Sequence, residues 1–193
     1  MPEKIIIGVS GNRGSFTEEA AKHYCALEKV ENYELEYLTS VENVLRSLDK
    51  GKINIGIFPI ENSNGGIVIE AVHAMARHVF QIEKMFEIDI KMNLLVKKGA
   101  DLKKIDAITS HQQALRQCRM YLKRKWPEAE LNEYPDTATA AKDLADGVIS
   151  ETTAVIAPKI CAELYGLELS EEGIQDLKFN FTTFIAAVNN YDR

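Results

Sequence analysis

The stretch Ser110-His111-Gln112-Gln113-Ala114-Leu115-Arg116-Gln117-Cys118 follows an apolar run, residues 105–108, and opens a helical pattern that continues to about Lys125. Serine with glutamine three positions later is typical of a capping box, so we expect Ser110 to accept from the backbone N–H of Gln113. Such a helix start presents free N–H groups and a partial positive charge, which suit a small anion. Taken alone, the segment is more typical of a well-capped surface helix than of a binding site.

Helix starts of the same kind follow other apolar runs. Ser15 with Glu18 and Thr39 with Glu42 have capping-box spacing, and Asp136 precedes another helical pattern. Strands and helices alternate along the chain, which indicates an α/β fold with largely parallel sheets. Ligands of such folds bind beyond the carboxyl ends of the strands, at helix N-termini. Four polar turns fit this description: Gly14-Ser15, Asn62-Ser63, Ser110-His111 and Asp136-Thr137. Their recurrence favours a small anionic ligand held by hydroxyls, amides and backbone N–H groups.

Composition excludes several classes of protein. With 193 residues, 46% of them apolar and 27% charged, the chain fits one globular domain or two small lobes. The net charge of −6 argues against a nucleic-acid partner. No apolar run approaches the roughly 20 residues that span a bilayer, and the apolar residues 5–7 are too few for a signal peptide. Three widely spaced cysteines indicate a reducing, cytoplasmic compartment: Cys25, Cys118 and Cys161.

Other chemistries find less support in the sequence. The glycines of residues 8–14 lack the spacing of a nucleotide-binding loop, and the four histidines are too scattered to indicate a metal site. Ser63 or Ser110 could act as a nucleophile with His111 as base, but neither serine lies in a Gly-x-Ser-x-Gly elbow. Glu61 lies in a predicted polar loop, residues 59–66, where it is either a general acid or a residue that ties the loop down.

Four motifs, in this order and over nearly the whole chain, resemble the prephenate dehydratase family. They are Gly14-Ser15-Phe16-Thr17-Glu18-Glu19-Ala20-Ala21; Pro59-Ile60-Glu61-Asn62-Ser63 with Gly66 and Val68; Ser110 to Cys118; and Ile174-Gln175-Asp176 with Asn180-Phe181-Thr182-Thr183-Phe184. The resemblance implies a two-lobe α/β fold, similar to type II periplasmic binding proteins, with the active site in the cleft between the lobes. We expect residues 1–78 plus 177–193 to form lobe 1 and residues 79–176 to form lobe 2.

The resemblance also implies an activity and its residues. Family members are lyases that convert prephenate to phenylpyruvate, losing water and carbon dioxide, without cofactor or metal. Thr182 is then the catalytic hydroxyl, which donates a hydrogen bond to the leaving oxygen. The residues implied to bind the dicarboxylate substrate, prephenate or its amino analogue arogenate, are Ser15, Asn62, Ser63, Ser110, His111, Gln117, Thr183 and Phe184. The family further implies a cytoplasmic homodimer that acts in phenylalanine biosynthesis.

The chain departs from the family pattern at one prominent position. The family motif Thr-Arg-Phe is here Thr182-Thr183-Phe184, so a positive charge expected near the substrate is absent. Arg13 or Arg116 could replace it. The alternatives are therefore a diverged homologue (a prephenate decarboxylase or another hydrolase) and a non-catalytic module that binds small anions. Because the chain ends nine residues after Phe184, we expect neither a regulatory ACT domain nor a fused chorismate mutase.

Overall fold

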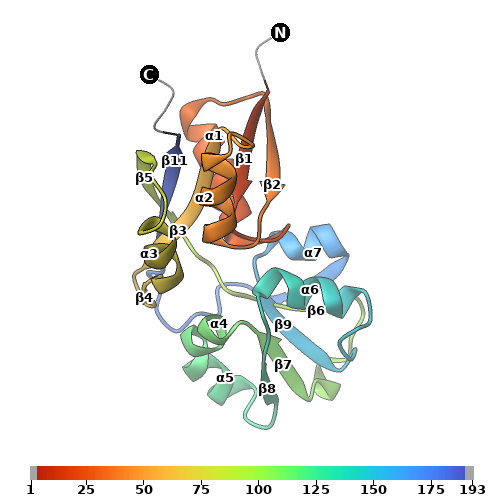
Figure 1. Ribbon diagram of the computed structural model, residues 1–193. Helices are drawn as coiled ribbons and strands as arrows, with labels where there is room; N and C mark the ends of the chain where they lie inside the picture. The colour runs from red at the N-terminus through yellow and green to blue at the C-terminus, as the bar shows by residue number, and fades with distance from the viewer. Residues whose placement is uncertain (1–3, 190–193) are drawn as a thin grey trace. The chain divides into compact units, whose positions relative to one another are not determined.

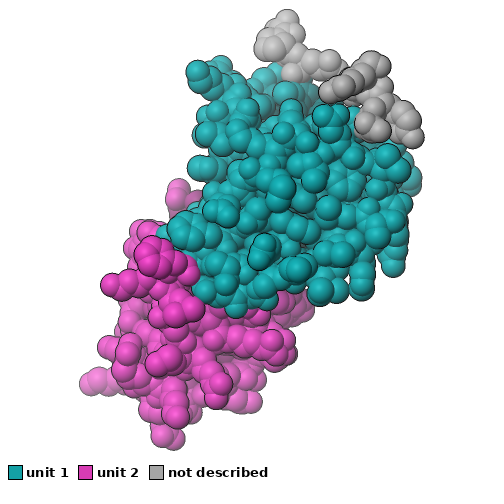
Figure 2. All heavy atoms as spheres, turned by 90° about the vertical axis from the view of Figure 1, so that its left-hand side faces the viewer, with its two compact units in different colours: residues 1–90, 180–193 teal, residues 91–179 magenta. Residues whose placement is uncertain are grey.

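The computed structural model describes residues 4–189, which form two compact units. Unit 1 comprises residues 1–90 and 180–193, and unit 2 comprises residues 91–179 (Figure 2). The predicted two-lobe α/β fold is confirmed. The first boundary lies after Ile90 instead of at the predicted 78/79, because the strand that follows residue 80 pairs within the sheet of unit 1. Residues 1–3 and 190–193 of the predicted lobe 1 lie outside the described residues.

Unit 1 is built on one mixed sheet with the strand order β2-β1-β3-β11-β5 (Figure 1). Its strands are β1 (Ile5–Val9), β2 (Tyr33–Tyr37), β3 (Ile55–Asn62), β4 (Gly66–Ile67), β5 (Gln81–Asp89) and β11 (Phe181–Val188). Strands β1, β2 and β3 are parallel, whereas β11 runs antiparallel to both β3 and β5. The prediction of largely parallel sheets therefore holds for only half of this sheet. The final strand inserts between β3 and β5, and long-range pairing of this kind leaves no local trace in the sequence.

Helices pack on both faces of the unit 1 sheet, and β11 separates the two cores. The helices are α1 (Phe16–Glu28), α2 (Val41–Asp49) and α3 (Ile69–Met75). Phe184 stacks on Phe86, which in turn packs against Tyr24 of α1. Ile185, the next residue, instead joins the apolar cluster that contains α2 and α3. Successive side chains of β11 thus point to opposite faces, as the pleat of a strand requires.

Of two predicted helix caps in unit 1, one is confirmed and the other is wrong. Ser15 caps α1 and accepts from the backbone N–H of Glu18 at 3.3 Å, as predicted. The predicted Thr39–Glu42 box is wrong, because Ser40 is the cap of α2 and accepts from the N–H of Asn43. Thr39 instead adopts a left-handed backbone conformation with φ of 63°. The cap therefore lies one residue later than the spacing indicated.

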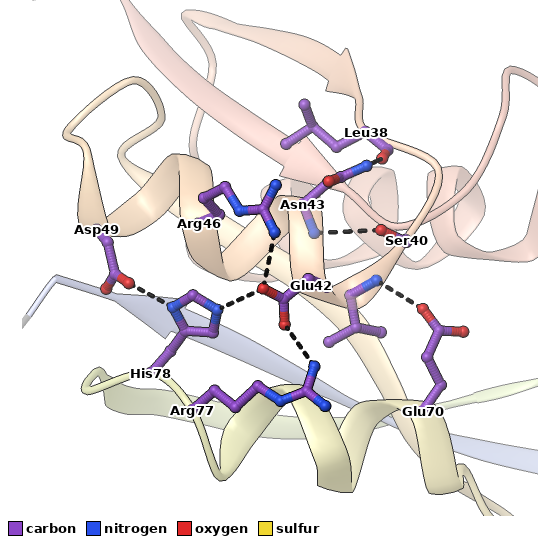
Figure 3. A network of polar contacts seen from close by, with 10 residues as sticks. Leu38, Ser40, Glu42, Asn43, Arg46, Asp49, Glu70, Arg77 and His78 are labelled. Carbon is purple, nitrogen blue, oxygen red and sulfur yellow. Dashed lines mark hydrogen bonds and ion pairs between the residues drawn. The ribbon is translucent and has the colours of Figure 1, made fainter.

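A charged network ties α2 to the end of α3 (Figure 3). The ring of His78, whose side chain is 10% exposed, bonds Asp49 through Nδ1 and Glu42 through Nε2, the latter at 3.2 Å. Burial lowers the pKa of His78, but the bonds to the two carboxylates raise it by more, so the net shift is upward. Arg46 adds a 3.0 Å bond to the same Glu42 oxygen. The network thus favours the protonated form of His78.

Unit 2 has a five-stranded mixed sheet with the order β10-β6-β9-β7-β8. Its strands are β6 (Asn93–Lys97), β7 (Ala107–Ser110), β8 (Glu130–Glu133), β9 (Thr153–Ala157) and β10 (Leu167–Glu171). Its helices are α4 (Gln112–Gln117), α5 (Arg119–Lys125), α6 (Thr137–Ala145) and α7 (Ile160–Tyr165), with a 3₁₀ turn, η1 (Leu102–Lys104). Asp136 caps α6 through the N–H of Thr139 at 2.8 Å, as predicted. Helices α6 and α7 bury an apolar cluster against β6 and β9.

Candidate functional site

The predicted site residues of unit 1 gather at one end of its sheet. Strand β1 ends just before the turn that leads to Ser15, and β3 ends at Asn62. Because β11 is antiparallel to β3, its first residues lie beside the end of β3, and Thr182 pairs with Asn62 in the register. Residues 59–62, predicted as a loop, are instead the end of β3. Segments far apart in the chain thus bring hydroxyls and amides to one edge.

Asn62 holds the hydroxyl of Thr182 directly. Its side-chain Nδ2 donates to Thr182 Oγ1 at 2.8 Å, while its Oδ1 accepts from the N–H groups of Asn64 at 3.0 Å and Gly65 at 2.8 Å. Thr182 is only 8% exposed. Within residues 4–189 its hydroxyl hydrogen has no acceptor. Since an amide N–H can only donate, the oxygen of Thr182 serves as acceptor and its hydrogen stays available to a ligand.

Ser63 completes the joint between β3 and β11. Its backbone N–H donates to Phe181 O at 2.8 Å, and its Oγ accepts from Phe181 N at 3.0 Å. The residue is exposed, and a hydroxyl that accepts keeps its own hydrogen for donation. Ser63 therefore adds a second hydroxyl donor one residue from Asn62. No histidine orients it as a nucleophile within the described residues.

Thr183 lies on the opposite face of β11 from Thr182. Its hydroxyl donates to Glu87 Oε1 at 3.2 Å, and Glu61 is its partner in the register on the other side. The position of the family arginine is thus flanked by two exposed carboxylates and is turned away from the Asn62–Thr182 bond. Phe184 is 1% exposed and packs in the core, so its predicted contact with substrate is at odds with its burial.

The turn before α1 is braced by a buried carboxylate. Glu18 is 3% exposed; its Oε2 accepts from Gly14 N at 2.6 Å, and its Oε1 pairs with Lys22 at 2.5 Å. Burial raises the pKa of Glu18, but Lys22 and the Gly14 N–H lower it by more, so the group stays ionised. Ser15 is half-buried at the cap, and Arg13 is exposed in the same turn. Glu18 thereby fixes the position of Ser15.

The predicted capping box at Ser110 is wrong. Ser110 is the last residue of β7, is fully buried, and donates its hydroxyl to the carbonyl oxygen of Ile156 on β9 at 2.6 Å. The cap of α4 is His111, whose Nδ1 accepts from the N–H of Gln113 at 3.3 Å. That contact requires an unprotonated Nδ1, so the ring's hydrogen lies on Nε2. Ser110 and His111 therefore form no nucleophile–base pair.

The expected long helix from Ser110 is broken at Cys118, and Asp176 stabilises the break. The backbone N–H of Asp176 donates to Gln117 O, and its carboxylate accepts from the N–H groups of Met120 and Tyr121, all at 2.8 Å. Burial and the nearby Asp176 raise the pKa of the Cys118 thiol to about 12, so it stays protonated. The role of Asp176 was missed, although it lies in a quoted motif, because its partners are about 55 residues away.

Three polar side chains of unit 2 that the sequence predicted as site residues lie on or next to α4. His111 and Arg116 are exposed and Gln117 is half-buried. Arg116 forms no ion pair within the part of the chain that the structure describes. Residues 4–189 contain no group of three or more His, Cys, Asp or Glu side chains that could hold a metal ion. None of their helices is long and apolar enough to cross a membrane.

Comparisons with known proteins agree on one family. The family model described as "Prephenate dehydratase" matches residues 7–190. A prephenate dehydratase of Methanocaldococcus jannaschii is 33% identical over 175 residues, 90% of this chain and 61% of the relative. A bifunctional chorismate mutase/prephenate dehydratase of Stutzerimonas stutzeri is 31% identical over 189 residues, 96% of this chain and 49% of the relative. This chain thus spans about half to three fifths of these relatives.

A solved structure shows a similar fold. Prephenate dehydratase from Arthrobacter aurescens, in complex with L-Phe, superposes with a TM-score of 0.84 at 26% identity. The match covers 96% of this chain and 60% of that one. The fold comparison and the sequence comparisons therefore indicate the same family.

Proposed function

Because this chain belongs to the prephenate dehydratase family, we propose that it converts prephenate to phenylpyruvate, with loss of water and carbon dioxide. The observation that carries the proposal is the 2.8 Å bond from Asn62 Nδ2 to Thr182 Oγ1. It leaves the hydroxyl of Thr182 with a hydrogen to donate, and the reaction needs a donor at the departing ring oxygen. Such a site acts by positioning and by stabilising charge that develops in the transition state.

Apart from one proton from the solvent, the chemistry needs no group from outside the protein. The ring carboxylate leaves as carbon dioxide, and the electron pair of its carbon–carbon bond enters the ring. As the ring becomes aromatic, the bond to the ring hydroxyl breaks. Thr182 donates a hydrogen bond to the departing oxygen, which leaves as water after it takes one proton from the solvent. We therefore propose a lyase that works without cofactor or metal.

We propose substrate-binding roles for polar side chains in both units. In unit 1, Ser63 supplies a hydroxyl next to Asn62, and Ser15 supplies one in the turn that follows β1. In unit 2, we propose substrate-binding roles for the Nε2–H of His111, for Gln117 and for Arg116, the last of which supplies a positive charge. Ser110 is proposed as a support for His111, since its own hydroxyl is used by Ile156. We propose no catalytic role for Glu61 or Arg13.

The missing arginine does not count against this proposal. Thr183 lies on the face of β11 away from Thr182, where it bonds Glu87. An arginine there would lie beside Glu61 and Glu87, so its loss removes a cross-strand charge pair and leaves the donors around Thr182 in place. No observation favours the decarboxylase, hydrolase or binding-module alternatives over the family's reaction.

We further propose a cytoplasmic homodimer that acts in phenylalanine biosynthesis. Three buried free cysteines are typical of a reducing compartment. Apolar side chains are exposed on unit 1 at Ile82 and Met85 of β5, the edge strand of the sheet, where a second chain has room to pack. Light scattering of the purified protein tests the dimer.

Incubation of the purified chain with prephenate tests the reaction. Phenylpyruvate should accumulate above the spontaneous rate, measured by its absorbance in alkali, and mass analysis should show loss of both water and carbon dioxide. Parallel incubation with arogenate, followed by detection of phenylalanine, compares the two substrates. Loss of carbon dioxide alone would identify a decarboxylase. Calorimetric binding of intact prephenate without turnover would leave a binding module and would refute the proposed reaction.

A further inference from the structure

Asn180 lies where the chain returns from unit 2 to unit 1, and it is fully buried. Its backbone oxygen accepts from the N–H of Ile90 at 2.7 Å, and its side-chain Nδ2 donates to Ile90 O at 3.1 Å. Ile90 is the last residue before the chain leaves unit 1. Asn180 therefore joins the two points at which the chain enters and leaves unit 2.

The partner on Ile90 fixes the orientation of the Asn180 amide. A carbonyl oxygen can only accept, so the NH₂ group of Asn180 must face Ile90 and its Oδ1 must face the other way. That oxygen accepts from Asn62 Nδ2 at 2.9 Å and from Asn64 Nδ2 at 3.3 Å. The NH₂ group of Asn62 is thereby directed toward Asn180, and the same nitrogen donates to Thr182 Oγ1.

We propose that Asn180 is a positioning residue that acts on Thr182 through Asn62. With Asn180 in place, Asn62 presents its NH₂ group to the hydroxyl oxygen of Thr182, so the hydroxyl hydrogen is left for the departing oxygen of the substrate. Without the acceptor on Asn180, Asn62 keeps the bonds of its Oδ1 to the N–H groups of Asn64 and Gly65, but its Nδ2 loses the 2.9 Å bond to Asn180. The bond from Nδ2 to Thr182 Oγ1 would then be held less firmly, so the hydroxyl of Thr182 would be less well oriented toward the departing oxygen. The inference rests on the proposed dehydratase reaction.

Two substitutions separate the effect of Asn180 on Asn62 from its effect on the stability of unit 1. Asn180→Ala removes both the bond to Ile90 and the acceptor for Asn62. Asn180→Asp loses the donor to Ile90 but keeps an oxygen for Asn62. If Asn180 acts through Asn62, kcat should fall about 10- to 100-fold in Asn180→Ala, with KM changed less than about threefold, because the hydroxyl of Thr182 is less precisely positioned. In Asn180→Asp, kcat should recover to within about threefold of wild type.

Asn93 provides a matched control in unit 2. It is 1% exposed, and its side chain bonds Lys91 O at 2.9 Å and Ala157 O at 3.2 Å, beside the same exit from unit 1. Within residues 4–189 no bond joins it to Asn62 or Thr182. Asn93→Ala should lower the melting temperature as Asn180→Ala does, yet leave kcat within about threefold of wild type.

Failure of the proposed role of Asn180 can be distinguished from failure of the proposed reaction. A wild-type chain without turnover would refute the proposed function, and this inference with it. An active wild type with Asn180→Ala no slower than Asn93→Ala, each scaled to folded protein, would overturn only the inference. A folded Asn180→Asp variant with kcat more than about tenfold below wild type would also overturn it. The Asn180→Asp variant therefore tests the inference even if Asn180→Ala does not fold.

Discussion

Glu87 of β5 accepts a hydrogen bond from the hydroxyl of Thr183 at 3.2 Å, on the face of β11 that Thr182 does not share. Glu61 of β3 flanks the same threonine from the other side. Thr183, where the resemblance leads us to expect an arginine, thus lies between two acidic residues in a row across three strands. Its substitution is expected to act on stability more than on the proposed chemistry.

Thr183→Arg should stabilise unit 1 while changing kcat less than about threefold. Opposite charges paired across strands contribute roughly 0.2–1 kcal/mol each, and the arginine gains two such partners. Thermal unfolding in low and high salt measures the gain, which salt should reduce. Thr183→Gln, of similar length but uncharged, is the control. A change in kcat above about tenfold would show that this position reaches the substrate.

Thr182→Val should lower kcat for prephenate by about 100- to 1000-fold, the usual cost of one oriented donor to a developing oxyanion. Thr182→Ser keeps the hydroxyl and should retain most of the activity. Thr153→Val replaces a threonine of β9 that is 4% exposed and should leave kcat unchanged. The assay is initial-rate formation of phenylpyruvate. Equal activity of Thr182→Val and wild type would remove the proposed donor from the mechanism.

His78→Asn should destabilise unit 1 more in acid than in alkali. The folded-state pKa of His78 lies above its unfolded value of about 6.5, so the protonated ring contributes fully below that pH and less as the pH rises through the folded value. We expect a melting temperature lower by about 2–4 °C at pH 5.5 and by less at pH 9. His73→Asn, exposed on α3, should show neither effect. A pH-independent difference would contradict the charged network.

Asp176→Ala should destabilise unit 2 and also raise KM for prephenate. Loss of a capping carboxylate costs about 1–2 kcal/mol, and Asp176 caps two N–H groups at the start of α5. The same carboxylate fixes the backbone three residues after Gln117, a proposed substrate ligand. Asp136→Ala removes the cap of α6 and should lower stability with KM unchanged. Chemical denaturation and steady-state kinetics separate the effects; equal KM values in both variants would contradict a link to Gln117.

Local sequence patterns predicted contacts between nearby residues well and contacts between distant residues poorly. The caps at Ser15 and Asp136 were predicted correctly because each side chain bonds an N–H only three residues away. The Ser110 cap failed because its hydroxyl bonds Ile156, 46 residues away, which no local spacing reveals. The same limit hid the bond between Asn62 and Thr182, which spans 120 residues. Thr182 was found through the family motif. Asn180 lies in the same motif but received no role, because its partners Ile90 and Asn62 are 90 and 118 residues away.

The joint between Ile90 and Asn180 has a consequence for the order of folding. Strands β5 and β11 are antiparallel neighbours, and the whole of unit 2 occupies the position of the loop that would join them as a hairpin. During synthesis β11 is the last strand made, so the sheet of unit 1 stays open between β3 and β5 until unit 2 has been translated. Unit 2 is continuous in sequence and can fold while unit 1 waits. A prefolded unit 2 whose ends lie together would shorten the effective loop and lower the entropy cost of inserting β11.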